Sequence, residues 1–439
     1  MSSLITRASH REIVALSIPA MAALAADPLL SLVDTALVGR LGAVPLAAMG
    51  VSTAVFTTVF WLFNFLTYGT TAEIARLRGA GEAPSAGRHV VQALWLALLC
   101  GLLVTAVLLL AAPLILAAMG AKGEVLDQAL SYLRVRALAA VPVMIVAVGH
   151  GAFRGLKDTR TPLWIAVATN LVNGFASWAL IYPAGLGIAG AAWGAVGAQS
   201  GAALTFLLLG RARLRPSTLR LDPAAMRRIV TISRDLFLRT ATLLGGVLVA
   251  TSVAARMGVV TVAAHQIIRE LWSLQGLVLD GFAIAGQALV ATAAGAARPD
   301  VARADARRLT VYGLAAGVLL GLLHLSLAGV LPRLFTTDPR ILAAVGEVWW
   351  VLAALLPAAG VVFVLDGILM GAADFRFLLG STALASLGGL VPVSLLALRL
   401  DAGLVALWWA MGVLMVIRLV TTLQRLRGGG WLLQRRTDA

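Results

Sequence analysis

The sequence predicts an all-α polytopic membrane protein with twelve transmembrane helices in two six-helix bundles. Of its 439 residues, 60% are hydrophobic and only 13% are charged, and the mean hydropathy is +0.93. Soluble domains carry about 45–50% apolar and about 25% charged residues, so these values exclude an ordinary soluble domain. Disorder is excluded as well, because it requires low hydrophobicity and high charge. The 44 glycines are typical of closely packed membrane helices, in which small residues let backbones approach.

Twelve apolar segments of spanning length are separated by charged residues, Gly and Pro. A spanning helix needs about 20 apolar residues, and windows of that length place spans near 13–38, 46–74, 89–117, 126–152, 161–182, 188–209, 236–257, 260–294, 308–331, 342–370, 377–398 and 404–424. The first segment could imitate a cleaved signal peptide. Its apolar run continues through Val38, beyond a signal core, and we therefore interpret it as the first span.

The widest polar interruption, residues 210–235, divides six spans from six. We predict an N-terminal bundle over 1–210, a basic cytoplasmic linker over 211–235 and a C-terminal bundle over 236–439. The N-terminus, the even-numbered links and the C-terminus hold 23 Lys and Arg residues, whereas the odd-numbered links hold 6. By the positive-inside rule, both termini are expected in the cytoplasm and the protein in the inner membrane. The net charge of +15 then reflects topology, and no nucleic-acid partner is expected.

The two halves share motifs at one constant displacement along the chain. Arg40-Leu41-Gly42 matches Arg256-Met257-Gly258, and the pattern Gly-x-x-x-Gly-x-x-Asp at 151–158 recurs at 367–374, so that both matches differ by 216 in the numbering. A displacement that contains six spans gives both halves the same orientation in the membrane. They should therefore be related by a pseudo-two-fold axis along the membrane normal, an arrangement suited to alternating access.

Several of these motifs resemble the multidrug and toxic compound extrusion (MATE) family. They are Leu32-Val33-Asp34-Thr35-Ala36-Leu37-Val38-Gly39-Arg40-Leu41-Gly42, Gly151-Ala152-Phe153-Arg154-Gly155-Leu156-Lys157-Asp158-Thr159 and Ala263-Ala264-His265-Gln266-Ile267. Residues 234–240 and 279–283 resemble the DinF-like branch. The resemblance implies multidrug efflux of small amphipathic, often cationic compounds by an antiporter driven by H⁺ or Na⁺. We expect a monomer that contacts membrane lipids.

Two departures from the family pattern concern the coupling ion. Many members carry an Asn in the fifth span followed four residues later by Asp, whereas Asn173 is followed here by Ser177. The NorM-like branch carries a Glu in the seventh span, and residues 236–257 contain no carboxylate. Both departures favour H⁺ as the coupling ion, with Na⁺ as the alternative.

Two carboxylates of the first span are the foremost candidates for proton coupling. Asp27 and Asp34 lie seven residues apart, which is two helical turns and about 10 Å along the axis. Ionisable groups at bilayer depth usually face a bundle interior or a wet cavity, and burial favours the protonated form of a carboxyl group. Alternatively, Asp34 is a polar residue of the outer interface. Asp27 precedes Pro28, which lacks an N–H and should kink the span.

Polar residues of two other spans are further candidates. Asn170, Asn173 and Ser177 share one face of the fifth span, where they could hydrogen-bond the carboxylates of the first span and report their protonation. Asn and Ser also join helices in bilayers without any further role. Asn64 and Tyr68 in the second span have the same two interpretations.

In the second half, the candidates for a substrate cavity are Asp280, Asp366, Gln266 and Glu270. The two aspartates lie toward the cytoplasmic ends of their spans, so they could instead brace loops through Arg298 or Arg376.

Sequence motifs of enzymes are missing. Cys100, the single cysteine, and five dispersed histidines make no plausible zinc site, and no Walker or dinucleotide-binding sequence occurs. We therefore expect neither enzymatic activity nor a cofactor. One alternative is a lipid-linked precursor flippase of the same superfamily, which would need cationic residues such as Arg239 and Arg269 in its cavity. An intramembrane enzyme is a second alternative, but the sequence offers no nucleophile–base or metal constellation for one. A major-facilitator exporter also has twelve spans, but residues 76–81 lack the signature of that family.

Overall fold

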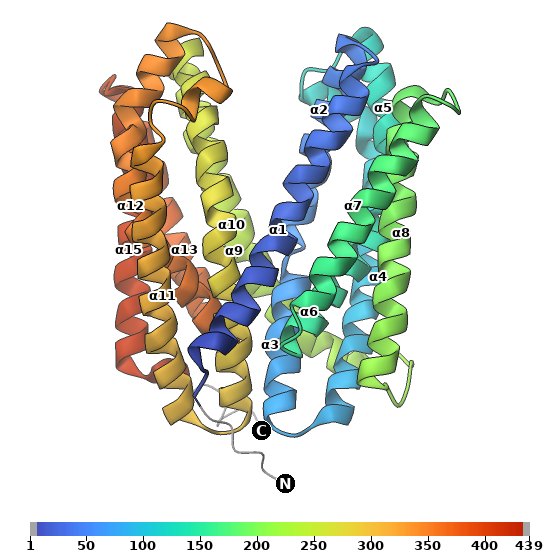
Figure 1. The fold of residues 1–439 in the computed structure, drawn as a ribbon, viewed down its shortest axis with the longest axis vertical. Coiled ribbons are helices and arrows are strands. Elements are labelled where there is room, and N and C mark those ends of the chain that lie inside the picture. Colours follow the sequence, from blue (N-terminus) through green and yellow to red (C-terminus); the bar gives the residue numbers. More distant parts are fainter. Residues whose placement is uncertain (1–6, 433–439) are drawn as a thin grey trace. The chain divides into compact units, whose positions relative to one another are not determined.

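The computed structural model describes residues 7–432, although the side chains of Asp27, Leu29, Leu30 and Arg228 lie outside that description (Figure 1). The described chain forms α1 (His10–Gly39), α2 (Ala43–Leu62), α3 (Phe65–Gly79), α4 (Ala83–Ala118), α5 (Gly123–Ala137), α6 (Ala140–Gly155), α7 (Arg160–Ile181), α8 (Gly187–Leu214), α9 (Pro223–Met257), α10 (Val259–Gly295), α11 (Pro299–Ser326), α12 (Pro339–Gly371), α13 (Phe375–Ala385), α14 (Val391–Arg399) and α15 (Gly403–Gly428). A π-helical turn, Ser386–Leu390, joins α13 to α14, and short 3₁₀ turns occupy Pro332–Leu334 and Gly430–Leu432.

The predicted all-α fold class is confirmed. Within residues 7–432, eleven helical segments are long and apolar enough to cross a membrane, and α5 with α6, bent by 49°, supplies a twelfth. Two of the spans are interrupted. The second span consists of α2 and α3, which are separated by Phe63 and Asn64. The eleventh span consists of α13, the π-helical turn and α14.

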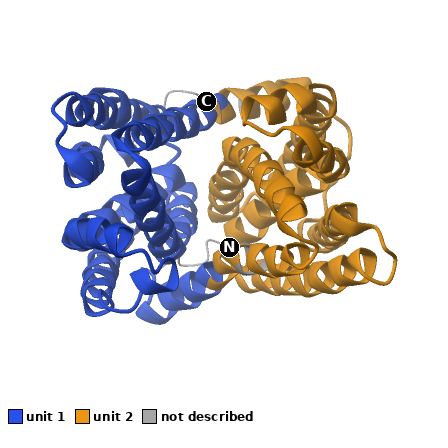
Figure 2. Ribbon diagram, turned by 90° about the horizontal axis from the view of Figure 1, so that it is seen from above, with its two compact units in different colours: residues 1–21, 234–439 blue, residues 22–233 orange. Residues whose placement is uncertain are grey.

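The chain folds into two compact units, coloured separately in Figure 2. Unit 2 is Ala22–Ser233, and unit 1 combines Met1–Met21 with Arg234–Ala439. This division differs from the ranges predicted above, because α1 and α9 each contribute residues to both units. In unit 1 the segment that precedes α1 is anchored on α11, where the backbone N–H of Ala8 donates to Asp305 at 2.9 Å and Arg308 donates to the carbonyl of Ala8.

The predicted linker 211–235 is mostly helical. The helix α8 extends to Leu214 and α9 begins at Pro223, so only residues 215–222 are left between them. These residues lie against α4 of the same unit: Gln92 donates to the carbonyl of Arg220 at 2.9 Å and accepts from the backbone N–H of Asp222 at 2.9 Å. Because helices can continue beyond the bilayer into water, hydropathy marked the end of the apolar part and not the end of the helix.

The sequence repeat extends to contacts within each unit. In unit 2, a Cβ on Gly151 of α6 would lie 2.6 Å from the backbone oxygen of Thr67 in α3. In unit 1, a Cβ on Gly367 of α12 would lie 2.2 Å from the backbone oxygen of Ala283 in α10. Gly367 and Ala283 therefore each lie 216 residues after their counterparts, Gly151 and Thr67. The two Gly-x-x-x-Gly motifs serve the close helix packing that such motifs allow in membranes.

Candidate coupling site and comparison with known proteins

A side-chain contact between α1 and α7 in unit 2 joins Asp34 to Asn173. The amide Nδ2 of Asn173 donates to both carboxylate oxygens of Asp34, at 3.0 and 3.2 Å. Asn173 is completely buried, whereas Asp34 is half-buried. Asn173 of the fifth span therefore contacts Asp34 of the first span, as the sequence predicted. The carboxylate of Asp34 remains partly exposed at the protein surface.

Two further hydrogen bonds hold α7 alongside α1. Asn170 donates to the backbone oxygen of Ala26 at 2.7 Å, and Tyr182 donates its hydroxyl to the backbone oxygen of Leu37 at 2.8 Å. Asn170 therefore binds the main chain of α1, so its observed contact is a helix-to-helix link. The predicted role of Asp27 lies outside the described residues, since the structure does not describe its side chain.

One buried polar atom of the site has no hydrogen-bond partner among the described residues, the amide oxygen Oδ1 of Asn173. Ser177 is completely buried, and its side chain contacts the carboxylate of Asp34. Buried polar atoms normally have partners, so Oδ1 of Asn173 provides hydrogen-bonding capacity beside the carboxylate that the described chain does not use.

Two residues of α5 that the sequence did not single out, Tyr132 and Arg136, also lie at the site. Arg136 interacts electrostatically with Asp34, and the buried hydroxyl of Tyr132 hydrogen-bonds both Arg136 and Thr53. The guanidinium carbon of Arg136 also lies 4.0 Å from the ring centroid of Phe56 in α2, a cation–π contact. An arginine four residues after a tyrosine inside an apolar span was the signal available in the sequence.

The second half carries a separate buried cluster of charges. Asp366 of α12 forms ion pairs with Arg239 of α9 and Arg418 of α15, and all three are at least nine-tenths buried. Asp280 of α10 interacts electrostatically with Arg418. The alternative interpretation, in which Asp366 braces a loop through Arg298 or Arg376, does not describe these ion pairs, because Arg239 and Arg418 belong to α9 and α15. Arg298 pairs with Asp300 at 2.8 Å.

The other second-half candidates form a local group on α10. Gln266 donates to Glu270 at 3.1 Å, and Arg269 contacts both of them at 3.2 and 3.1 Å. Gln266 and Glu270 are exposed in this structure, and their hydrogen bonds remain within one helix. In unit 2, Asn64 lies at the break between α2 and α3, and Tyr68 follows one turn later in α3.

The repeat does not extend to these polar groups. The residues of the second half that correspond to Asp34, Asn173 and Ser177 are Ala250, Gly389 and Val393. Conversely, Asp366 corresponds to His150, while Arg239 and Arg418 correspond to Ala23 and Ala202. Each half therefore carries its own polar group on a shared packing scheme.

Long apolar helices with a half-buried carboxylate held by an interior amide are typical of membrane proteins that move ions or substrates. The MatE family model matches residues 19–179 and 236–395. Protein DETOXIFICATION 45, chloroplastic, of Arabidopsis thaliana is 33% identical over 456 residues, covering 98% of this chain and 80% of the relative. DNA damage-inducible protein F of Escherichia coli is 31% identical over 406 residues, covering 89% and 86%.

Solved structures agree on the fold. An outward-facing multidrug resistance MATE family transporter of the MOP superfamily aligns with a TM-score of 0.87 at 24% identity, covering 95% of this chain and 96% of that one. A MOP superfamily transporter from Pyrococcus furiosus aligns with a TM-score of 0.86 at 23% identity, covering 96% and 95%. The chain belongs to the MATE family, and it is a polytopic membrane transporter and not an enzyme.

Proposed function

We propose that this transporter is a secondary active exporter that exchanges H⁺ for small amphipathic, often cationic compounds at Asp34. The observation that carries the proposal is the half-buried carboxylate of Asp34, held by the amide of the fully buried Asn173. An anionic carboxylate in a low-dielectric surrounding is costly unless its charge is compensated. A proton and a cationic substrate compensate the same charge, so they compete for it, and that competition couples their opposite movements.

Asn173 suits both protonation states of Asp34. Its Nδ2 donates to the ionised carboxylate, and its Oδ1 has no partner in the described chain. Because a side-chain amide carries a donor and an acceptor at opposite positions, a rotation of the amide would let Oδ1 accept the hydroxyl of a protonated Asp34. In the proposed cycle, a proton from outside binds Asp34 and displaces the substrate. The protonated protein then releases the proton inside and binds substrate again.

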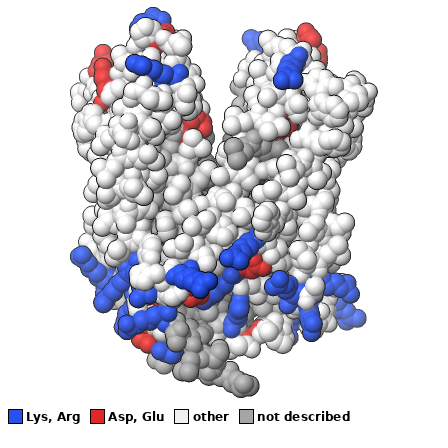
Figure 3. All heavy atoms as spheres, in the orientation of Figure 1, with Lys and Arg blue, Asp and Glu red and all other residues white. Residues whose placement is uncertain are grey.

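The proposed topology places both termini in the cytoplasm and the protein, as a monomer, in the inner membrane. In each unit, Lys and Arg gather at one end of the helices, as Figure 3 shows. That asymmetry supports the orientation by the positive-inside rule. The relative with a solved outward-facing structure is described as a multidrug resistance transporter, which supports polyspecific efflux as the activity here.

The flippase alternative requires cationic residues that can bind pyrophosphate. Its two candidates already have acidic partners in this structure: Arg239 pairs with Asp366 and Arg269 with Glu270 at 3.1 Å. This pairing favours the exporter. For the coupling ion, Ser177 at the position of the second carboxylate leaves one anionic group in the Asp34–Asn173 contact, which favours a single proton over Na⁺.

Efflux from proteoliposomes with separately imposed gradients tests the proposal. We expect an inwardly directed H⁺ gradient to drive extrusion of a cationic dye at equal Na⁺ on both sides, and a Na⁺ gradient at equal pH to drive none. Transport driven by Na⁺ alone would overturn the proposed ion. Transfer of a lipid-linked pyrophosphate without transport of any cationic dye would favour the flippase.

A further inference from the structure

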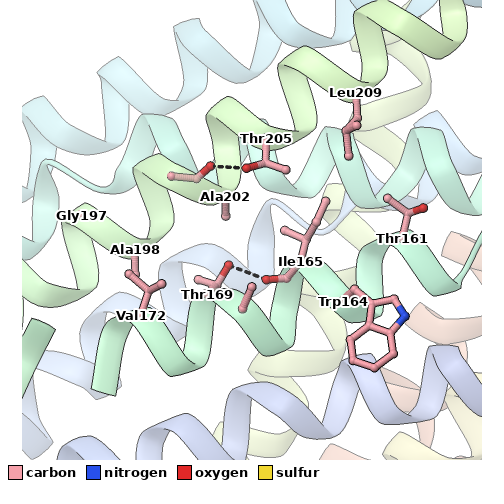
Figure 4. Close-up of a pocket in the computed structure, with 12 residues that line it drawn as sticks. Thr161, Trp164, Ile165, Thr169, Val172, Gly197, Ala198, Ala202, Thr205 and Leu209 are labelled. Atoms are coloured by element: carbon pink, nitrogen blue, oxygen red, sulfur yellow. Dashed lines mark hydrogen bonds between the residues drawn. The ribbon is translucent and has the colours of Figure 1, made fainter. Parts of the chain in front are cut away.

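A groove of about 450 Å³ runs between α7 and α8 on unit 2, and residues of these two helices alone line it (Figure 4). We propose that it binds an acyl chain of an anionic phospholipid, whose phosphate is held by Arg160 and Arg213. This site is separate from the Asp34–Asn173 contact, since neither of those residues lines the groove. The proposal therefore does not depend on the transport mechanism.

The interior of the groove suits a hydrocarbon chain. Its two central hydroxyl groups are bonded to their own helices: Thr169 donates to the backbone oxygen of Ile165 at 2.7 Å and Thr205 donates to that of Gly201 at 2.8 Å (Figure 4). Such back-bonding within a helix leaves the methyl groups of the threonines to line the groove. At Gly197 and Gly201, a Cβ would meet nothing within 4 Å, so these glycines leave room for an occupant.

The length of the groove matches one leaflet of a bilayer. On α7 it extends from Thr161 to Val172, which at about 1.5 Å per residue is about 16 Å, close to half of the roughly 30 Å hydrocarbon core. Trp164 lies near the Thr161 end and is 68% exposed. An exposed tryptophan at this position is typical of the headgroup level, where one side of the ring is apolar and the other is wet.

Charge at that end selects the headgroup. Figure 4 shows Thr161 and Leu209 at the same end of the groove. Arg160 lies four residues before Trp164 and Arg213 lies four residues after Leu209, and both arginines are exposed. The carboxylate of Asp158 is nearby, but it accepts from the backbone N–H and hydroxyl of Thr161, at 3.0 and 2.7 Å. Two long cationic side chains beside an apolar groove complement a phosphate attached to an acyl chain.

Native mass spectrometry of the purified full chain, titrated with phosphatidylglycerol or phosphatidylcholine, tests the site. We expect the native chain to retain phosphatidylglycerol in preference to phosphatidylcholine. Gly201→Leu fills the groove and should abolish this retention. Its matched control, Gly210→Leu, should retain the lipid, because Gly210 does not line the groove and a Cβ there also meets nothing within 4 Å.

The headgroup contacts are tested by the double variant Arg160→Gln/Arg213→Gln. It should weaken phosphatidylglycerol binding about 25-fold, because each arginine near an anionic headgroup contributes roughly fivefold to the affinity. Binding of phosphatidylcholine should remain unchanged. Arg211→Gln is the matched control, since Arg211 is exposed on α8 but lies about 200° around the helix from Leu209. Unchanged phosphatidylglycerol retention in Gly201→Leu, or equal binding of both lipids to the native chain, would overturn the proposal. An unchanged Tm would show that each variant is folded.

Discussion

One amide of Asn173 donates to both carboxylate oxygens of Asp34, at 3.0 and 3.2 Å. A hydrogen bond to a charged group contributes about 1.5–3 kcal/mol, so this contact stabilises the anion specifically. Loss of a proton from Asp34 therefore strengthens the link between α1 and α7, and binding of a proton weakens it. The contact is the element of the proposed cycle that mutation can test most directly.

Replacing Asp34 by Asn should abolish proton-coupled efflux and leave the protein folded in the membrane. The variant keeps the size of the side chain and one of its two acceptor oxygens, but it has no titratable proton. Substrate-dependent proton release from proteoliposomes measures the effect. Asp300→Asn, which changes an exposed carboxylate paired with Arg298, should behave as the native protein does. Undiminished proton release by the Asp34 variant would remove this residue from the mechanism.

Replacing Asn173 by Leu should move the pH of half-maximal transport upward. The reason is that the lost hydrogen bond stabilised the anion, so the protonated form of the site persists to a higher pH in the variant. Asn170→Leu is the control, because Asn170 binds the backbone oxygen of Ala26 and not the carboxylate. A shift of equal size in the control would show that the effect comes from helix packing.

Replacing Arg136 by Gln should move the pH profile in the same direction. A nearby positive charge favours the ionised carboxylate, and the variant removes that charge. Arg134→Gln, on an exposed position of the same helix, should leave the profile unchanged. The measurement is dye efflux at a series of external pH values with a fixed pH difference. A downward shift in the Arg136 variant would contradict the assigned electrostatic role.

Replacing Gly194 by Ala should destabilise unit 2 and impair transport. The new Cβ would lie 2.7 Å from the backbone nitrogen and 2.6 Å from the hydroxyl oxygen of Ser177. The part of α7 that contains Asn173 and Ser177 would therefore have to shift. Overpacking of this kind costs about 1–3 kcal/mol. Gly197→Ala on the same helix meets nothing within 4 Å and should keep the native Tm and rate. Equal Tm values for the two variants would refute the packing argument.

Replacing Asp366 by Asn should lower the stability of unit 1 by about 3–5 kcal/mol. The variant leaves the buried guanidinium groups of Arg239 and Arg418 without their shared counter-ion, and breaking a buried pair has about that cost. Thermal unfolding in detergent provides the measurement. Glu270→Gln disrupts an exposed pair with Arg269 and should cost about 0–1 kcal/mol. Equal effects of the two changes would argue against a stabilising role for the buried ion pairs of Asp366.

Hydropathy predicted the spans well because each helix must be apolar across the bilayer, whatever its neighbours are. The contact between Asp34 and Asn173 could be expected because a carboxylate at bilayer depth needs polar partners, and the fifth span carries polar side chains on one face. The partners of Asp366 could not, since Arg239 and Arg418 are far from it along the chain and only the packing of α9, α12 and α15 brings them together. The role of Arg136 likewise depends on how α5 approaches α1.

The glycine contacts that recur in both halves are made to main-chain oxygens, at Thr67 in one half and at Ala283 in the other. Any amino acid supplies such an oxygen, so the fit between helices is insensitive to which side chain the carbonyl-bearing residue carries. A duplicated ancestor built in this way could change the chemistry of one copy without losing its architecture. That freedom makes a carboxylate–amide pair in one half compatible with an arginine-flanked aspartate in the other.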